Sequence, residues 1–324
     1  MKHLVIGGGS IGKRHLNNLF KLGERDLFCL KRSYNKDFEN EFNCTVISSY
    51  DEVKLLKPEI IYVCNPTALH HEGLSWAQNL GAHLFMEKPL TNDENIIHEM
   101  LQQWNKQQVF FIGFVLRYHP LVKSIKEKLN EKVIGEVFSA RFEFGSYLPN
   151  WHPWENYKEG YAAIKSLGGG VINTITHELD LILYLFGNPT SVLAAKANLG
   201  HLQIDVEELS ESIFRYPWGF ATLHLDFLQK DYDRQIKILA TAGKIIWNWR
   251  DNEVIIERLS EPKETIEIKV DDFNQLYIDE LKDFFELIRL NKIQHPLDFD
   301  YAINNTKWML AIHKSAETQK TWEI

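Results

Sequence analysis

The strongest indication of the fold of this chain is the sequence His3-Leu4-Val5-Ile6-Gly7-Gly8-Gly9-Ser10-Ile11-Gly12. Its first four residues include a compact apolar run, typical of a buried strand, that ends directly in glycines. From residue 11 to residue 22 apolar side chains recur at helical spacing. The sequence therefore predicts a strand, a tight glycine turn and a helix in immediate succession.

The glycine spacing in this turn indicates a dinucleotide site. Gly7 permits the tight turn, Gly9 lets the backbone approach a pyrophosphate, and Gly12 lets helix and strand pack closely. The helix that opens at Ser10 or Ile11 directs free N–H groups and its positive dipole end at the phosphates. The strand before the motif and the helix after it supply the context that the fingerprint requires.

The residues after the second predicted strand bear on the choice of dinucleotide. An acid about 20 residues after the turn would bind the ribose 2′-hydroxyl of NAD. Here the chain has Lys31, Arg32 and Ser33, which supply donors for a 2′-phosphate. We therefore expect NADP to be preferred over NAD; a solvated basic turn is the alternative interpretation.

The remaining pattern divides the chain into two predicted domains, 1–119 and 120–324. The first is an α/β domain with a doubly wound parallel sheet, because short, wholly apolar runs alternate with helical patterns. The second is an α+β domain with a large, mostly antiparallel open sheet, since alternating strands fill 189–270. Further apolar runs lie at 27–30, 45–47, 60–63, 83–86 and 109–112, and helices are expected at 68–80, 92–106, 120–130, 173–186, 273–291 and 299–318.

Composition excludes several classes of protein. The 324 residues carry a net charge of −8 with scattered basic residues, which argues against a nucleic-acid partner. No apolar stretch reaches the roughly 18 residues of a membrane span, and the start of the chain lacks a signal-peptide pattern. Three cysteines without a CxxC pair fit a reducing compartment, so a cytoplasmic location is expected. Histidine spacing predicts no metal site.

Several further motifs occur in order along the chain. They are Cys64-Asn65-Pro66-Thr67-Ala68-Leu69-His70, Glu87-Lys88-Pro89-Leu90, Gly113-Phe114 with Arg117-Tyr118, and Gly168-Gly169-Gly170-Val171-Ile172-Asn173 leading to His177 and Asp180. Together with the glycine turn, this set resembles the glucose–fructose oxidoreductase / inositol dehydrogenase / MocA (Gfo/Idh/MocA) family. The resemblance implies a Rossmann domain joined to an open-sheet domain, and oxidation of a secondary alcohol or reduction of a ketone on a sugar, sugar nucleotide or polyol.

The resemblance also assigns roles to residues. Lys88 would lie beside the reacting carbon and His177 would be the acid/base, with Asn173 at the remaining catalytic position. The cofactor would be lined by Asn65, Pro66, Thr67 and His70, and its nicotinamide pocket shaped by Glu87 and Pro89. The substrate would meet Arg117, Tyr118 and Asp180.

The chemistry of these side chains supports the assignment. Alcohol oxidation needs removal of the hydroxyl proton, which suits a histidine, while a lysine ammonium stabilises developing alkoxide charge. A four-residue spacing predicts that Asn173 and His177 share one helix face. In isolation, a lysine after a strand is commonly a solvated residue, and a helical histidine is commonly structural.

One position departs from the family pattern, which usually has aspartate where Asn173 stands. An asparagine orients a neighbour but takes up no proton. This leaves two alternatives open: a reductase of a non-sugar ketone or conjugated double bond, resembling biliverdin reductase, and a non-catalytic NADP-binding sensor.

An aromatic loop at 145–161 has two interpretations. Trp151 and Tyr161 would stack on a sugar ring or, equally, fill a contact between domains or subunits. The family pairs subunits through the open face of its second-domain sheet, so a homodimer or homotetramer is expected.

Overall fold

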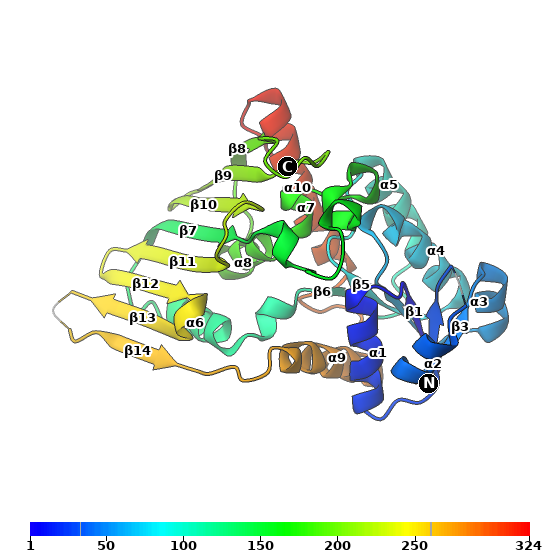
Figure 1. Cartoon of the computed structure of the whole chain (residues 1–324). Helices are drawn as coiled ribbons and strands as arrows, with labels where there is room; N and C mark the ends of the chain where they lie inside the picture. Colours follow the sequence, from blue (N-terminus) through cyan, green and yellow to red (C-terminus); the bar gives the residue numbers. More distant parts are fainter. Residues whose placement is uncertain (33, 260) are drawn as a thin grey trace. The chain divides into compact units, whose positions relative to one another are not determined.

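The computed structural model describes residues 1–32, 34–259 and 261–324 (Figure 1). Its contacts divide the chain into two compact units. The first consists of residues 1–115 and 273–306, and the second of residues 116–272 and 307–324. Each unit is built around its own sheet.

The sheet of the first unit is parallel throughout, with strand order β3-β2-β1-β4-β5-β6. The central strands are wholly buried, which explains why they are continuous apolar runs in the sequence. This is the predicted doubly wound sheet, and the α/β fold class is confirmed. The strands are β1 (His3–Ile6), β2 (Leu27–Leu30), β3 (Thr45–Ile47), β4 (Ile60–Val63), β5 (His83–Glu87) and β6 (Phe110–Gly113).

Helices follow these strands, and short polar side chains begin several of them. Asn35, Ser49 and Asp93 each accept a hydrogen bond from a backbone N–H two or three residues further on, as N-cap residues do. The helices of this unit are α1 (Ser10–Lys21), α2 (Lys36–Phe42), α3 (Tyr50–Leu56), α4 (His70–Leu80), α5 (Glu94–Gln103), α9 (Asn274–Arg289) and the first part of α10 (Phe299–Thr318).

Helix α9 belongs to the first unit although it lies far along the chain. Phe284 on α9 is fully buried, and its ring lies 5.6 Å from those of Phe85 and Phe111 and 6.2 Å from that of Tyr62. Burial of such a ring stabilises the fold by about 1.5–3 kcal/mol. Residues 273–306, expected in the second domain, therefore pack with the first unit; the division at residue 119 into two consecutive domains stays a prediction.

The sheet of the second unit has the order β14-β13-β12-β11-β7-β10-β9-β8. Its neighbours are antiparallel except for β7 and β10, which run parallel, so the predicted mostly antiparallel sheet is confirmed. The strands are β7 (Val137–Gly145), β8 (Ser191–Ala197), β9 (Leu209–Tyr216), β10 (Gly219–Asp226), β11 (Asp233–Ala240), β12 (Gly243–Asn248), β13 (Glu253–Arg258) and β14 (Glu264–Glu267).

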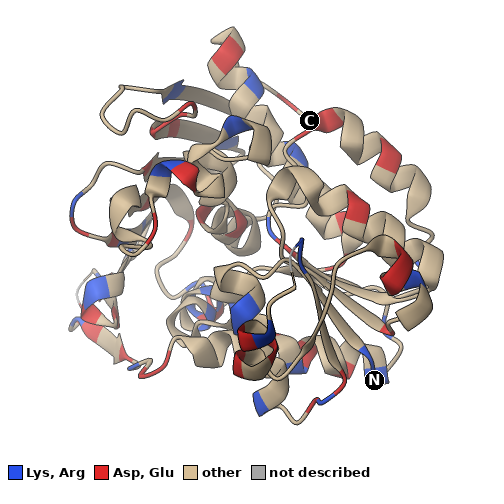
Figure 2. Ribbon diagram, turned by 45° about the vertical axis from the view of Figure 1, so that its right-hand side comes forward, with Lys and Arg blue, Asp and Glu red and all other residues tan. Residues whose placement is uncertain are grey.

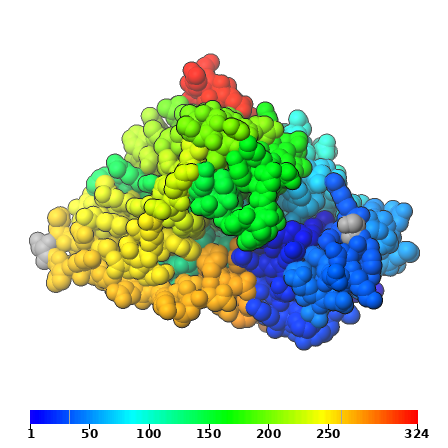
Figure 3. All heavy atoms as spheres, in the orientation of Figure 1, coloured from blue at the N-terminus to red at the C-terminus, as the bar shows by residue number. Residues whose placement is uncertain are grey.

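The two faces of this sheet differ in burial. Along β9 buried and exposed residues alternate strictly, so one face is packed and the other is open. Helices α7 (Val171–Thr174) and α8 (His177–Phe186) contact the central strands (Figure 1). The C-terminal end pairs with β8 through Val192 and Trp322, and Figure 3 shows the red C-terminal residues against this edge.

The helix predicted over 173–186 is confirmed from His177 to Phe186, but it does not run unbroken from residue 173. Helix α7 ends at Thr174 and α8 begins at His177. Between them Ile175 has a non-helical backbone, with φ −107° and ψ 51°. Ile175 and Thr176 are β-branched, which weakens helix propensity at the break. Asn173 and His177 consequently do not share one helix face.

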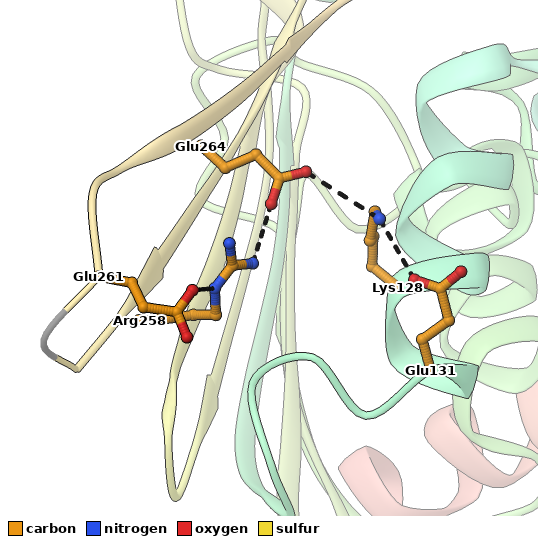
Figure 4. A network of polar contacts seen from close by, with 5 residues as sticks. All are labelled: Lys128, Glu131, Arg258, Glu261 and Glu264. Atoms are coloured by element: carbon orange, nitrogen blue, oxygen red, sulfur yellow. Dashed lines mark hydrogen bonds and ion pairs between the residues drawn. The ribbon is translucent and has the colours of Figure 1, made fainter.

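Surface charge is dispersed over both units. Figure 2 shows basic and acidic segments interspersed along the ribbon. Where charges gather, they pair: Arg258 on β13 binds Glu264 on β14 at 2.8 Å, and Lys128 on α6 (Pro120–Asn130) binds Glu131 at 3.2 Å (Figure 4). Exposed pairs of this kind each contribute at most about 1 kcal/mol.

In the part of the chain that the structure describes, no helix combines the length and the apolar character needed to cross a membrane.

Candidate functional site

The glycine turn after β1 has the geometry that its sequence predicts. Gly7 adopts a φ of +103°, a region that side chains disfavour. A Cβ atom on Gly12 would overlap the carbonyl oxygen of Gly7, so only glycine lets α1 approach β1 this closely. A Cβ on Gly9, by contrast, would have no described atom within 4 Å. The space above Gly9 is thus available to a ligand.

The N-terminus of α1 is suited to an anion. Among the described residues no side chain caps it, and its first turn contains no acid. Ser10 and Ile11 begin the helix, whose first N–H groups have no intrahelical acceptors. A pyrophosphate fits this donor set because the helix dipole and the open N–H groups both favour negative charge.

The basic residues after β2 lie beside this turn. A Cβ on Gly8 would come within 2.9 Å of Cδ of Lys31, whose Nζ lies 4.1 Å from the centre of the Phe38 ring. Arg32 is exposed. Ser33, the third predicted donor, lies outside the described residues. Lys31 therefore lies beside the glycine turn.

The ends of β4 and β5 are joined by His70. Its Nδ1 lies 2.8 Å from the carbonyl oxygen of Pro89, and its Nε2 lies 2.9 Å from that of Asn65. Burial lowers the pKa of His70. The backbone N of Asn65 also lies against Gly7, so the predicted cofactor residues converge on the same edge of the sheet; Pro66 there is half-buried and Thr67 is buried.

Glu87 and Lys88 stand at the end of β5. Glu87 is buried, and its carboxylate lies 2.8 Å from Nε2 of His15 on α1, which is fully buried. Lys88 follows directly and is half-buried. Sequence analysis identified His15 only as a position on a helix, because its partner Glu87 is 72 residues away. The pair ties the strand end before Lys88 to the first helix.

In the second unit, two buried ion pairs hold α8. Arg117 donates to both carboxylate oxygens of Asp180, at 3.0 and 2.8 Å, and Arg234 on β11 binds Glu178. Asp180 has no exposed surface. Both acids lie in the first turn of the helix that His177 begins. The substrate contacts predicted for Arg117 and Asp180 stay predictions; in this structure the two side chains bind each other.

The side-chain amide of Asn173 is engaged by the protein's own groups. Its Nδ2 donates to the carbonyl oxygens of Gly168 (3.3 Å) and Gly169 (3.0 Å). Its Oδ1 lies 2.9 Å from Nε2 of His313 on α10. Sequence reasoning missed His313, which is 140 positions away.

The remaining substrate candidates lie in the second unit. Trp151 is half-buried, donates through its indole N–H to Ser146 at 2.9 Å, and packs edge-on against Phe227. Tyr161 is 37% exposed in a short 3₁₀ turn, and Tyr118 is half-buried beside Lys123. Their role towards substrate stays a prediction.

Two family models match the chain. The model described as an oxidoreductase family with an NAD-binding Rossmann fold matches residues 1–114, and the model of the Gfo/Idh/MocA C-terminal domain matches residues 122–246. Together they include the glycine turn, Lys88 and His177.

The individual curated relatives are only distantly similar to this chain in sequence. A myo-inositol 2-dehydrogenase of Thermotoga maritima is 24% identical over 88% of this chain and 87% of its own length. An uncharacterized oxidoreductase, YrbE, of Bacillus subtilis is 26% identical over 59% of the chain. The aligned region spans about half the length of this and several other curated relatives.

Solved structures share the fold over the whole chain. A levoglucosan dehydrogenase in complex with NADH has a TM-score of 0.88 at 18% identity, covering 100% of this chain and 99% of its own. A myo-inositol 2-dehydrogenase of Lactobacillus plantarum has a TM-score of 0.83 at 21% identity, with the same coverage. With both halves of the family pattern matched, this chain belongs to the Gfo/Idh/MocA family of oxidoreductases.

Proposed function

We propose that the chain is an NAD(P)-dependent dehydrogenase or reductase acting on a secondary alcohol or ketone of a sugar, sugar nucleotide or polyol. The observation that carries the proposal is the open glycine turn beside the anchored strand end that bears Lys88. Relatives named inositol, levoglucosan and glucoside dehydrogenases support the substrate class.

The first unit would hold the dinucleotide. The N–H groups at the start of α1 bind the pyrophosphate, and Gly9 leaves room for it. Asn65, His70 and Pro89 line the strand ends, where ligands of doubly wound sheets bind. When bound, the nicotinamide supplies or accepts the hydride.

Lys88 and His177 would handle the oxygen and its proton. The Lys88 ammonium donates a hydrogen bond to the substrate oxygen and stabilises negative charge as the alcohol is oxidised. His177 takes the hydroxyl proton in oxidation and returns a proton to the oxygen in reduction. The buried pairs from Glu178 and Asp180 fix the helix turn from which His177 projects.

NADP is the preferred dinucleotide in this proposal. Lys31 lies against the glycine turn and Arg32 is exposed next to it, so two cations stand where NAD-specific sites carry an acid. A relative crystallised with NADH shows that NAD(H) serves other members of the fold. The proposed preference for NADP over NAD is measured as the ratio of the two kcat/KM values.

The test is a screen of wild type, Lys88→Met and His177→Gln against sugars, polyols and their ketones with NADP(H) and NAD(H). We expect each variant to lose about 10²–10⁴-fold in kcat on the best substrate, with dinucleotide affinity retained. Lys128→Met, on an exposed ion pair, is the matched control and keeps wild-type activity. Variants within threefold of wild type would contradict the assigned roles.

The same screen separates the two alternatives. Turnover of non-sugar ketones or conjugated double bonds without any activity on polyols would support the reductase related to biliverdin reductase. Dinucleotide binding without hydride exchange on any substrate would support a sensor.

We also propose a cytoplasmic homodimer or homotetramer. The open face of the eight-stranded sheet exposes Leu193, Ile213 and Phe220, at 44%, 45% and 47%, and an exposed apolar face favours a covering partner. Light scattering of the wild type and of Ile213→Lys tests this. A wild-type monomer at high concentration would contradict it.

A further inference from the structure

Asn173 belongs to a network of polar contacts that connects it to the C-terminal helix α10. His313 on α10 contacts Asn173 through Nε2 at 2.9 Å, and its Nδ1 lies 3.0 Å from Nζ of Lys196 on β8. Lys196 also donates to Glu317, one turn further along α10, at 2.6 Å. Asn173 itself donates to the carbonyl oxygens of the glycine turn that precedes α7.

The direction of each hydrogen bond follows from Lys196. A lysine ammonium only donates, so Nδ1 of His313 accepts and carries no proton. The proton of a neutral ring is then on Nε2, which donates to Oδ1 of Asn173. The amide nitrogen of Asn173 faces two carbonyl oxygens and donates to both. Each contact from Lys196 to the glycine turn is thus a matched donor and acceptor.

The neutral state of His313 is consistent with its surroundings. Burial and the neighbouring Lys196 ammonium lower the pKa of His313 to about 4. The hydrogen bond from Lys196 lowers the pKa of Glu317, which stays ionised. Glu207 and Lys165 are the other charged groups that act on this cluster. Near neutral pH, His313 is therefore a fixed donor to Asn173.

This arrangement suits an amide and opposes a carboxylate at position 173. In an aspartate, the oxygen replacing Nδ2 would lie about 3 Å from two carbonyl oxygens without a hydrogen between them, as the distances of 3.0 and 3.3 Å show. The asparagine is thus matched to His313 and to the glycine turn.

We propose that His313, oriented by Lys196 and Glu317, is a positioning residue for the reaction. It fixes the Asn173 amide, which holds the turn at 168–169 and the short helix α7 that leads to His177. Asn173 is then a positioning residue as well, because its amide is engaged by the protein. This inference rests on the proposed function of His177.

The test compares His313→Leu with His313→Gln. The leucine removes the donor to Asn173, whereas the glutamine amide retains both a donor and an acceptor. We expect His313→Leu to lower kcat about tenfold with unchanged KM for the dinucleotide, and His313→Gln to stay within about threefold of wild type. His201→Leu, at an exposed histidine of the same unit, is the matched control and has no effect.

Asn173→Asp supplies a pH readout that a purely structural role would not change. Only a protonated carboxyl can donate to the turn, so we expect kcat/KM of this variant to fall with rising pH in a range where wild type is constant. A pH profile identical to wild type, or equal kcat in His313→Leu and wild type, would overturn the proposal.

NMR of the ¹⁵N-labelled His313 ring tests the contacts without any substrate. We expect a neutral ring with its proton on Nε2 that remains neutral at pH 5 in wild type. A proton on Nδ1, or titration near pH 6.5, would overturn the network even in an active enzyme. The expected tautomer in a chain without hydride exchange would instead show that the proposed function fails while the network holds.

Discussion

Two glycine runs precede helices in this molecule, and their surroundings are opposite. Around Gly7–Gly12 the helix start is uncapped and a Cβ on Gly9 would meet nothing. Around Gly168–Gly170 the groups are occupied: Asn173 binds the carbonyl oxygens, Glu207 accepts from Ile172 N–H at 3.2 Å, and a Cβ on Gly169 would contact the carbonyl oxygens of Tyr161 and Ala162.

A binding turn and a structural turn differ in what surrounds their glycines. Glycine permits another group to approach the backbone closely in both turns. At Gly168–Gly170 that group is the protein's own backbone and side chains. At Gly9 no group of the protein occupies the space. A glycine with open space beside unsatisfied N–H groups indicates a ligand. A glycine that is enclosed by the protein's own carbonyl oxygens indicates a structural turn.

The largest expected effect is on the stability of the second unit, in helix α8, which follows the turn at Gly168–Gly170 along the chain. Asp180→Leu leaves the buried Arg117 without its bidentate partner, so we expect the free energy of unfolding to fall by about 3–5 kcal/mol in urea titrations. The double variant Arg117→Met/Asp180→Leu removes both charges and recovers most of the loss. Unchanged stability together with a raised KM for substrate would instead show that the pair serves the ligand.

Gly169→Ala tests the filled turn directly. The added methyl group overlaps two backbone carbonyl oxygens, so we expect a loss of about 1–3 kcal/mol in unfolding free energy with unchanged dinucleotide affinity. Gly160→Ala is the control. The atom nearest to its added Cβ would be 3.3 Å away, and the backbone φ of −71° suits alanine. Equal stability of the two variants would mean that the second turn is not filled.

The open turn at Gly7–Gly12 was predictable from the sequence, whereas the surroundings of the filled turn at Gly168–Gly170 were not. Strand, glycine turn and helix are local, and their spacing carries the pattern within a dozen residues. The partners of Asn173 and Glu87, namely His313 and His15, lie 140 and 72 residues away, where no period relates them. The break at Ile175 was missed because apolar residues continue at helical spacing through it.

The assignment of α9 to the first unit has a similar cause. The amphipathic pattern over 273–291 predicted a helix, which the structure confirms as α9. Nothing in that pattern says which apolar surface the helix covers. Phe284 packs on Phe85 and Phe111, which lie about 170–200 residues earlier in the chain.

A smaller effect concerns the cofactor preference of the open turn. Lys31→Ala/Arg32→Ala removes both cations near the expected 2′-phosphate. We expect kcat/KM for NADPH to fall about tenfold relative to that for NADH, since a charged hydrogen bond contributes roughly 1.5–3 kcal/mol. Lys21→Ala, at the far end of α1, serves as the control. An unchanged ratio would mean that these residues form a solvated turn.

The smallest effect separates two histidines by pH. Hydrogen bonds to Asp226 and Glu211 raise the pKa of His224 to about 9, so its stabilisation is complete below pH 6.5 and is lost as pH rises through 9. The pKa of His313 is lowered to about 4, so its contribution is complete above pH 6.5 and is lost as pH falls through 4.

Thermal unfolding of His224→Gln and His313→Gln across pH 4–10 measures this contrast. The first variant should lose the alkaline decline and the second the acid decline of the wild-type curve. Parallel curves for all three proteins would contradict both assignments.

Calorimetric titration of NADPH into wild type and Gly9→Val tests the central claim, that the open turn is a dinucleotide site. We expect one NADPH per wild-type chain, and at least a tenfold loss of affinity in Gly9→Val at an unchanged melting temperature, because Cβ at position 9 enters open space beside the start of α1. Equal affinity in the two proteins, or no binding to wild type, would contradict it.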